Sequence, residues 1–191
     1  MTGDGMQWIP GVFDTYCLAF ARGITVSELV RRMGADIAAV RHGVTGGDAF
    51  SLAMGEGPVA LLGTSEGWAF SLEHWSDQAA DNAVLGRLST GTQAVVLLNG
   101  GTGPLKLACA DNGSVVADFE PGVAAADIGT SAADHLVAIA REAGLFETDG
   151  GPALGEGDEE LWMLRFAEEV FRLTLPRDEV EHGTLDAVLL P

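Results

Sequence analysis

The densest group of side chains able to do chemistry lies in five consecutive residues, Glu73 to Asp77. Glu73, His74 and Asp77 supply two carboxylates and an imidazole, the groups that move protons in a hydrolase or a small-ligand enzyme. The stretch stands between a predicted strand and a predicted helix, a position that often faces a pocket. For His74, a surface or helix-capping role is the simpler interpretation. We expect no metal here, because no third ligand can be placed from the sequence.

A second candidate is the stretch Gly63-Thr64-Ser65-Glu66-Gly67, which matches the G-x-S-x-G pattern of a hydrolase nucleophile. That pattern exposes a reactive serine only where a strand leads into the turn and a helix follows it. Here the following residues, 68–73, alternate between large apolar side chains and small or polar ones, which predicts a second strand with one buried face. We therefore interpret Ser65 as part of a β-hairpin turn, where glycine, threonine and serine are common.

A third candidate is the glycine-rich stretch of residues 99–104, which follows an apolar run and resembles a phosphate-binding loop. Such a loop needs a helix N-terminus after it, and the Walker type also needs a lysine. Neither follows here, since Pro104 leads into another predicted strand. The histidines and the two cysteines show no metal-binding spacing. We therefore predict a turn at this position, and neither a metal nor a cofactor for the chain.

The chain is strongly acidic, with 28 Asp and Glu against 10 Lys and Arg and a formal net charge of −18. This charge repels phosphate groups, so we expect no direct contact with nucleic acid or with an anionic membrane. It attracts a basic protein partner. No apolar run approaches the ~20 residues that span a bilayer, and residues 1–7 lack the positive charge of a signal peptide. We expect a cytoplasmic protein.

The length of 191 residues and the 47% apolar content predict one α+β domain over residues 1–191. Residues 1–11 are expected to form a loose arm, and residues 147–157 a mobile acidic loop. We predict a largely antiparallel, meandering sheet of five or six strands, packed by about five helices. The strands are expected at residues 49–54, 59–62, 68–73, 93–98, 105–110 and 114–119, and the tail at 185–190 is expected as an edge strand.

Helices are predicted from apolar spacing and from capping residues. Phe13, Tyr16, Cys17 and Phe20 fall on one helical face, which predicts a helix over residues 13–22. The others are expected over residues 25–33, 77–88, 131–143 and 158–174, starting at the capping residues Thr25, Ser76 or Asp77, Ser131 and Asp158.

The turn at Asp111-Asn112-Gly113 permits two hairpin registers. A two-residue Asn-Gly loop sets Leu107 opposite Asp118. A three-residue loop sets Leu107 opposite Ala117 and pairs Lys106 with Asp118 on the other face. We prefer the three-residue loop with a left-handed Gly113, because it keeps apolar residues together and matches opposite charges.

Three stretches carry a resemblance to a known family. They are Tyr16 to Thr25 followed by Leu29 to Ala35; Gly67 to Glu73; and Leu88 to Val95 with Asp111-Asn112-Gly113 and Phe119-Glu120-Pro121. These stretches resemble an actinobacterial family known only as a domain of unknown function, over roughly residues 13–125. The resemblance implies an opening helix, a second helix, a central strand that ends in glutamate and a hairpin. It implies no activity.

Taken together, these features predict a non-catalytic protein-binding domain, similar in character to immunity proteins and antitoxins, that neutralises a basic partner. The expected contact residues are Glu73, Trp75, Asp77, Asp158, Glu159 and Glu160. One alternative is a small hydrolase or ligand-binding enzyme that uses Glu73, His74 and Asp77, with Ser65 as a further candidate. Another is a regulatory or scaffold subunit that docks through its tail. An enzyme requires these side chains to converge in a concave pocket, with at least one perturbed pKa.

Overall fold

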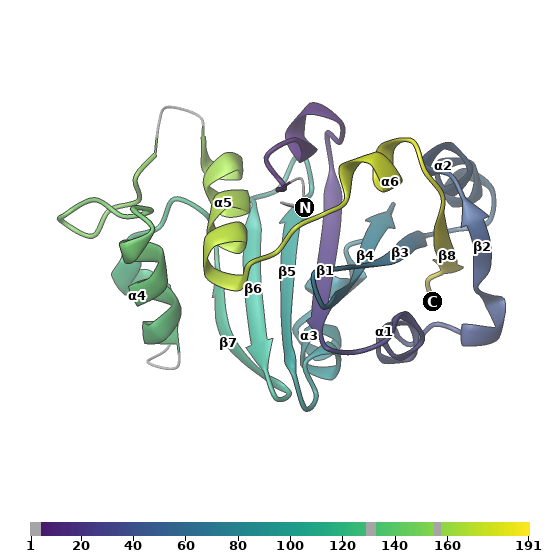
Figure 1. Ribbon diagram of the computed structural model, residues 1–191, viewed down its shortest axis with the longest axis horizontal. Coiled ribbons are helices and arrows are strands. Elements are labelled where there is room, and N and C mark those ends of the chain that lie inside the picture. Colours follow the sequence, from purple (N-terminus) through teal and green to yellow (C-terminus); the bar gives the residue numbers. More distant parts are fainter. Residues whose placement is uncertain (1–4, 129–132, 155–157) are drawn as a thin grey trace.

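The computed structural model describes residues 5–128, 133–154 and 158–191. Within these residues lies one eight-stranded sheet in the order β2-β8-β3-β4-β1-β5-β6-β7, with every neighbouring pair antiparallel (Figure 1). The strands are β1 (Tyr16–Arg22), β2 (Arg41–Val44), β3 (Val59–Ser65), β4 (Trp68–His74), β5 (Gln93–Asn99), β6 (Lys106–Asp111), β7 (Ser114–Phe119) and β8 (Leu185–Leu189). The predicted α+β class and antiparallel sheet are confirmed, whereas five or six strands were too few.

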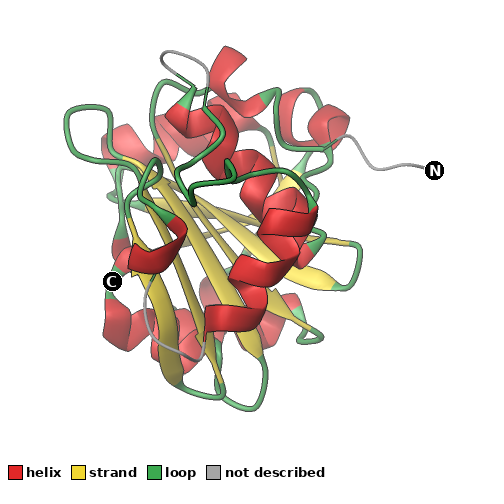
Figure 2. Cartoon of the chain, turned by 90° about the vertical axis from the view of Figure 1, so that its left-hand side faces the viewer, coloured by secondary structure: helices red, strands yellow, loops and turns green. Residues whose placement is uncertain are grey.

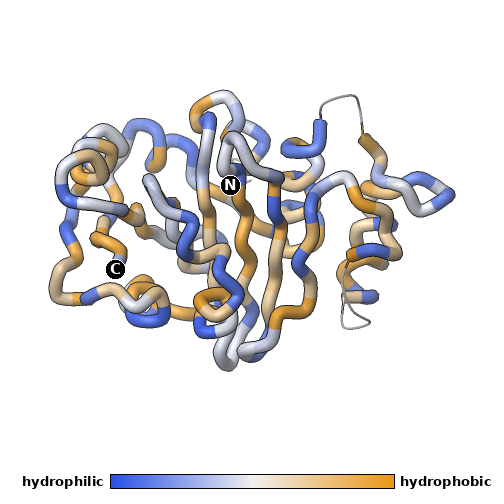
Figure 3. The backbone as a smooth tube through the Cα atoms, turned by 180° about the vertical axis from the view of Figure 1, so that it is seen from behind, coloured by the Kyte–Doolittle hydropathy of each residue, from blue (hydrophilic) through white to orange (hydrophobic). Residues whose placement is uncertain are grey.

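Six α-helices lie within the described residues, and they cover both faces of the sheet (Figure 2). They are α1 (Val26–Met33), α2 (Gly46–Gly55), α3 (Asn82–Leu88), α4 (Asp134–Glu142), α5 (Glu159–Phe171) and α6 (Arg177–Glu181). One face packs against α2, α4, α5 and α6 around large side chains such as Phe20, Phe70 and Phe166. The other packs against α1 and α3 around smaller ones. Figure 3 shows the hydrophobic stretches concentrated along the central strands.

The helix predicted over residues 13–22 is wrong, because residues 16–22 form the central strand β1, between β4 and β5. Residues 16–21 are all buried, with Leu18 and Phe20 in one core and Cys17 and Ala19 in the other. A strand that is buried on both faces lacks the alternation of a half-exposed strand, and its apolar run resembles a helical face. β4 is likewise buried on both faces, whereas the sequence predicted one buried face.

The strand predicted over residues 49–54 is also wrong, since these residues belong to α2. Thr45 and Asp48 form a complete capping box, in which each side chain accepts a hydrogen bond from the other residue's backbone N–H. Ala49 and Ala53 face the core, whereas Phe50 and Met54 remain exposed. The two glycines that open the helix obscured it in the sequence, because glycine disfavours helices.

The tail strand is confirmed as β8, but it does not lie at the edge of the sheet. It pairs with β3 on one side and with β2 on the other. The edge strand is β2, which the sequence did not predict. The sheet therefore gains two strands beyond β3 that are brought together from distant parts of the chain.

The hairpin between β6 and β7 uses a two-residue loop, so the predicted three-residue loop is wrong. Asn112 and Gly113 have φ angles of 47° and 86°, and Asp111 pairs with Ser114. An Asn-Gly loop with two positive φ angles twists in the same sense as the strands, which makes it a favoured hairpin turn.

A β-bulge then shifts the register, so that the two-residue loop and the pairing of apolar residues can both form. The register skips Val116, which sets Cys109 opposite Ala117 and Leu107 opposite Phe119. Asp118 thus lies opposite Ala108, but it still reaches Lys106, with 3.2 Å between the Lys106 Nζ and a carboxylate oxygen. The predicted ion pair is confirmed in this diagonal form.

The remaining helices differ from the predictions mainly at their ends. Thr25 caps α1, where its hydroxyl accepts a hydrogen bond from Glu28 N, and a left-handed Gly34 ends the helix. The helix expected over residues 77–88 is split into a 3₁₀ turn, η3 (Gln78–Ala80), and α3, which Asp81 caps. The expected cap at Ser131 lies outside the described residues.

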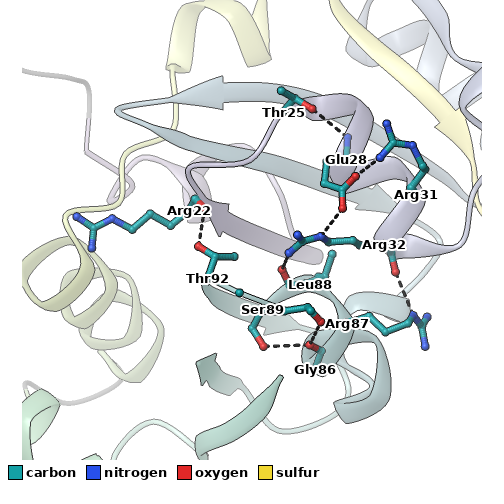
Figure 4. A network of polar contacts seen from close by, with 12 residues as sticks. Arg22, Thr25, Glu28, Arg31, Arg32, Gly86, Arg87, Leu88, Ser89 and Thr92 are labelled. Carbon is teal, nitrogen blue, oxygen red and sulfur yellow. Dashed lines mark hydrogen bonds and ion pairs between the residues drawn. The ribbon is translucent and has the colours of Figure 1, made fainter. Parts of the chain in front are cut away.

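A polar network joins α1 to α3 on one face of the sheet (Figure 4). The Glu28 carboxylate accepts hydrogen bonds from both Arg31 and Arg32. Arg32 also donates to the Leu88 carbonyl at 2.8 Å, and Arg87 donates to the Arg32 carbonyl at 3.1 Å. Arg32 and Arg87 therefore hold these two helices together, whereas the Arg31 bond lies within α1.

The N-terminal arm is not loose where it is described. Met6 and Ile9 are fully buried, and the Met6 N–H donates to the Glu168 carboxylate of α5. In the loop expected to be mobile, residues 147–151 form a hydrogen-bonded turn. Residues 1–4 and 155–157 lie outside the described part of the chain.

Candidate functional site

Three central strands begin or end at one end of the sheet, the upper end in Figure 1, and bring distant residues together there. β4 ends at His74, β1 begins at Tyr16 and β5 ends at Asn99. Tyr16 pairs with Asn99, and Cys17 pairs with Glu73. The stretch from Glu73 to Asp77 therefore lies beside the chain that enters β1 and the chain that leaves β5.

Three hollows follow one another across this end of the sheet, with volumes of 440, 270 and 500 Å³. The first and second share Thr15, Glu73 and Trp75. The second and third share Asp77 and Leu98. Because neighbouring hollows have walls in common, they form one continuous surface, which we call the sheet-end groove.

Glu73 is a buried capping residue, with a side chain that is fixed by the backbone of η3. Its two carboxylate oxygens accept hydrogen bonds from Gln78 N at 2.9 Å and Ala79 N at 3.0 Å. Only 3% of the residue is exposed. Burial raises the pKa of Glu73, and the hydrogen bonds from Ser76, Ala79 and Gln78 oppose that rise. The Glu73 side chain thus stabilises the turn after β4.

His74 lines the first hollow together with Glu73. Burial lowers the pKa of the His74 imidazole, because the charged form loses its hydration. Its Nε2 is buried without a hydrogen-bond partner. Buried polar atoms are usually paired, so an unpaired ring nitrogen beside a hollow is a feature that needs an explanation.

Trp75 is the most unusual residue of the groove. It is 62% exposed, and its backbone has a φ of 60°, in the left-handed region that bulky residues avoid. Its ring meets the edge of Phe50, which is 52% exposed, with 6.3 Å between the ring centroids. Both rings line the first hollow. Trp75 belongs to neither hydrophobic core, so core packing does not explain this conformation.

The other predicted contact residues divide into two groups. Asp77 is exposed between the second and third hollows. Glu160 is half-buried, and one of its carboxylate oxygens accepts a hydrogen bond from Asn99 Nδ2 at 3.0 Å. Asn99 lines the second hollow. Asp158 and Glu159 lie exposed at the start of α5 and line none of the three hollows.

Tyr16 adds a second buried polar atom without a partner at this end of the sheet. The residue is 2% exposed, and its hydroxyl makes no hydrogen bond of normal geometry. Burial raises its pKa, and the nearby Glu160 carboxylate adds to that rise. Tyr16 therefore stays protonated and neutral, and it lines the second hollow.

Ser65 lies far from these groups, at the other end of the β3–β4 hairpin. Ser65 pairs with Trp68, whereas His74 pairs with Val59 at the opposite end. Six residues of strand separate the two ends, or about 20 Å at ~3.3 Å per residue. The Ser65 hydroxyl instead lies 2.6 Å from the Thr174 hydroxyl. Ser65 and His74 therefore cannot act as one catalytic pair in this fold.

Among residues 5–128, 133–154 and 158–191, no group of three or more His, Cys, Asp or Glu side chains could hold a metal ion. No helix in these ranges has the length and apolar character to cross a membrane.

The sequence predicted part of the groove and missed the rest. Glu73 to Asp77 was visible as a run of polar and aromatic residues. Phe50 was missed because α2 was predicted as a strand, although the Thr45 and Asp48 capping box could have indicated the helix. Phe13, Tyr16 and Asn99 could not be placed without the strand register.

A family model described as "Family of unknown function (DUF6461)" matches residues 6–170 of the chain. No curated protein and no solved structure matches the chain. The matched range includes the second and third hollows in full. In the first hollow, only Val180, Glu181 and His182 lie outside that range.

Proposed function

The chain belongs to DUF6461, a family of unknown function, and we therefore propose from the geometry alone that it is a non-catalytic binding domain for a basic protein. In this proposal the partner docks on the sheet-end groove, with Trp75 as its anchor. Such a domain fits the role of an immunity protein or antitoxin that neutralises a basic toxin. The resemblance in sequence also favours an actinobacterial source, and a cytoplasmic location remains part of the proposal.

The observation that carries the proposal is the exposed pair of Trp75 and Phe50. Large aromatic side chains dominate binding energy at protein interfaces, and tryptophan is the most enriched among them. The left-handed backbone of Trp75 costs ~1–2 kcal/mol in the folded chain. Strain of this kind is concentrated at functional positions. A binding role explains why the chain keeps an exposed indole in an unfavourable conformation.

The charge around Trp75 favours a basic partner over an acidic one. Asp14 and Asp77 are exposed carboxylates in hollows that Trp75 lines. Carboxylates around an aromatic anchor steer a cationic surface into place and raise the association rate at low salt. An Arg or Lys side chain can also stack on an exposed indole, which contributes about 0.5–1 kcal/mol.

The test is affinity capture from a lysate of the native cell with three matched baits. These are the wild-type chain, the Trp75→Gly variant, and the Glu142→Gln variant as a control on α4, which lies far from α2 in Figure 1. We expect a basic protein that the wild type and Glu142→Gln retain and Trp75→Gly loses. Retention of the same proteins by all three baits would count against the proposal.

A small-ligand enzyme is the second candidate, because Glu73 and His74 line one hollow and both have shifted pKa values. Two observations weaken it. Both oxygens of Glu73 accept backbone hydrogen bonds, and Asp77 does not line the hollow that contains His74. A hydrolase screen of the wild type against ester and amide substrates, with His74→Gln as the control, separates the two candidates. Turnover that disappears in His74→Gln would favour the enzyme.

The scaffold alternative required an exposed tail strand, and β8 does not provide one. Leu185, Ala187 and Val188 are buried, and β8 is enclosed between β2 and β3. A scaffold role would therefore need another surface, for which the sheet-end groove is the best candidate.

A further inference from the structure

We propose that the sheet-end groove binds one extended, basic segment of the partner, with an apolar side chain in the first hollow and cationic side chains in the second and third. This inference rests on the proposed function and specifies the form of the partner. It predicts a short linear segment in place of a rigid, folded surface.

The arrangement of the three hollows in a row fits an elongated occupant. Its three hollows lie in series and share walls, so a ligand that fills one is in contact with the next. Between β4 and β6 the groove crosses three strand spacings, or about 14 Å at ~4.8 Å each. An extended chain advances ~3.3 Å per residue, so about five or six residues reach from the first hollow to the third.

The second hollow has the size of a single side chain and is smaller than the body of a helix. One helical turn is about 10 Å wide and 5.4 Å long with its side chains, which corresponds to on the order of 400 Å³. The second hollow measures 270 Å³. It accommodates a single side chain, and an extended segment presents alternate side chains on one side at ~6.6 Å intervals.

The first hollow has the walls that an apolar side chain needs. Phe13, Phe50 and Trp75 supply aromatic surface, and Leu61 and Val180 supply aliphatic surface. The carboxylate of Glu181 in this hollow is already bonded to Arg177. Burial of a leucine-sized side chain against such walls contributes about 1.5–3 kcal/mol.

Carboxylates outnumber cations in the second and third hollows, although Glu73 and Asp81 also cap η3 and α3. Among the described residues that line them, the carboxylates are Glu73, Asp77 and Asp81, and the single lysine or arginine is Lys106. Lys106 is engaged on the protein itself, because its Nζ donates to the Ala80 carbonyl at 3.0 Å and pairs with Asp118. Asp77 has no cationic partner within ion-pair distance in the described structure.

Tyr16 supplies an observation that is independent of the acidic residues. It lines the second hollow and is 98% buried, and its hydroxyl lies near the Glu160 carboxylate but makes no hydrogen bond of normal geometry. A hydroxyl can accept a hydrogen bond from an ammonium or guanidinium group. A cationic side chain that enters the second hollow would give this hydroxyl a partner beside Asn99 and Asp77.

The experiment is an NMR titration of the full ¹⁵N-labelled chain with the synthetic peptide acetyl-Leu-Ala-Lys-Ala-Arg-Ala-Lys-amide. We expect the indole N–H signal of Trp75, assigned by comparison with Trp75→Phe, and the Asn99 side-chain amide to shift together along one binding curve. The Trp162 indole, which donates to the Leu145 carbonyl at 2.8 Å inside the core, is the internal reference. Its signal should not move.

The matched controls separate charge from position. The same peptide with glutamate in place of lysine and arginine should leave all the indole signals in place. Asp77→Asn should raise the Kd about threefold, the size expected for one exposed charge pair. Glu142→Gln changes the net charge of the chain equally but lies on α4, and it should leave the Kd unchanged.

Three results would overturn the inference. The first is a Trp75 indole signal that does not respond to the basic peptide. The second is a helix-stapled version of that peptide that binds tighter than the extended one. The third is a concentration-dependent Trp75 shift without peptide, which would assign the groove to a second copy of the chain. If a lysate partner still depends on Trp75 in any of these cases, the proposed function stands and only the extended segment is rejected.

Discussion

Trp75 combines exposure with backbone strain, so its removal should abolish binding and leave stability nearly unchanged. Trp75→Gly removes the left-handed strain of about 1–2 kcal/mol, and it loses an edge contact with Phe50 worth about 0.5–1.5 kcal/mol. We expect the free energy of unfolding to stay within ~1 kcal/mol of the wild type while partner binding is lost. Urea denaturation of both proteins measures the first effect. A large loss of stability would mean that Trp75 is a structural residue.

Glu73 and Asp77 are both candidate contact residues, but the structure assigns them different roles. Glu73→Ala leaves the N–H groups of Gln78 and Ala79 without their acceptor, and we expect it to lower the free energy of unfolding by about 2–4 kcal/mol. Asp77 is exposed, so Asp77→Ala should change it by less than ~0.5 kcal/mol. Chemical denaturation of the two variants checks the contrast. Equal losses would contradict the capping role of Glu73.

His74 should make stability depend on pH in a defined window. Its pKa in the folded chain lies below the ordinary value of 6.5, so the folded state favours the neutral ring. The contribution of the neutral His74 ring to the free energy of unfolding is fully present above pH 6.5. This contribution is lost as the pH falls from 6.5 through the lowered pKa. We expect the stability difference between wild type and His74→Gln to shrink over that window. A difference that is constant with pH would contradict this assignment.

At the scale of elements, the β3–β4 hairpin depends on a glycine that faces an aromatic ring. A Cβ at Gly63 would lie 2.5 Å from Phe70 Cζ, and Phe70 is fully buried. Gly63→Ala should therefore lower stability by ~1–3 kcal/mol through overpacking. Gly55→Ala is the matched control, because a Cβ there meets nothing within 4 Å at the end of α2. It should be neutral or stabilising by up to ~1 kcal/mol, and thermal unfolding of both variants measures the difference.

The sequence predicted elements well where local signals agree with the tertiary environment. The apolar run of β5 and the Thr25 cap of α1 were both found, because neither depends on a distant partner. β1 was mistaken for a helix because burial on both faces removes the period of two. α2 was mistaken for a strand because glycines at its first two positions hide its start. β2 was missed because its four residues are largely exposed and because it pairs with the distant strand β8, with Val44 opposite Leu185.

The candidate site was predictable to the same limited extent. Glu73 to Asp77 was found because its residue types stand next to one another in the chain. The groove itself was not found, because its walls come from segments that only the strand register brings together. The hairpin of β6 and β7 shows the same limit. The Asn-Gly turn favoured one register, apolar pairing favoured another, and the bulge at Val116 reconciles them.

At the scale of the whole molecule, the chain has a net charge of −18, and carboxylates outnumber lysine and arginine side chains along the groove. Several of the chain's cations are already used within the fold. Arg31 and Arg32 bind Glu28, Arg41 binds Glu56, and Lys106 binds Asp118. A basic partner therefore meets carboxylates with few competing internal cations. The Debye length is ~10 Å at 0.1 M salt and ~3 Å at 1 M, so salt should weaken this attraction.

The most direct test of the central claim is the affinity of a captured partner for the wild type and for Trp75→Gly, measured by titration calorimetry at low and high salt. We predict that the wild-type Kd rises at least about tenfold between 0.05 and 0.5 M salt, because the complex depends on opposite charges. We also predict that Trp75→Gly shows no measurable binding at either salt concentration. A complex with an affinity that is indifferent both to salt and to Trp75→Gly would contradict a binding site at the sheet-end groove.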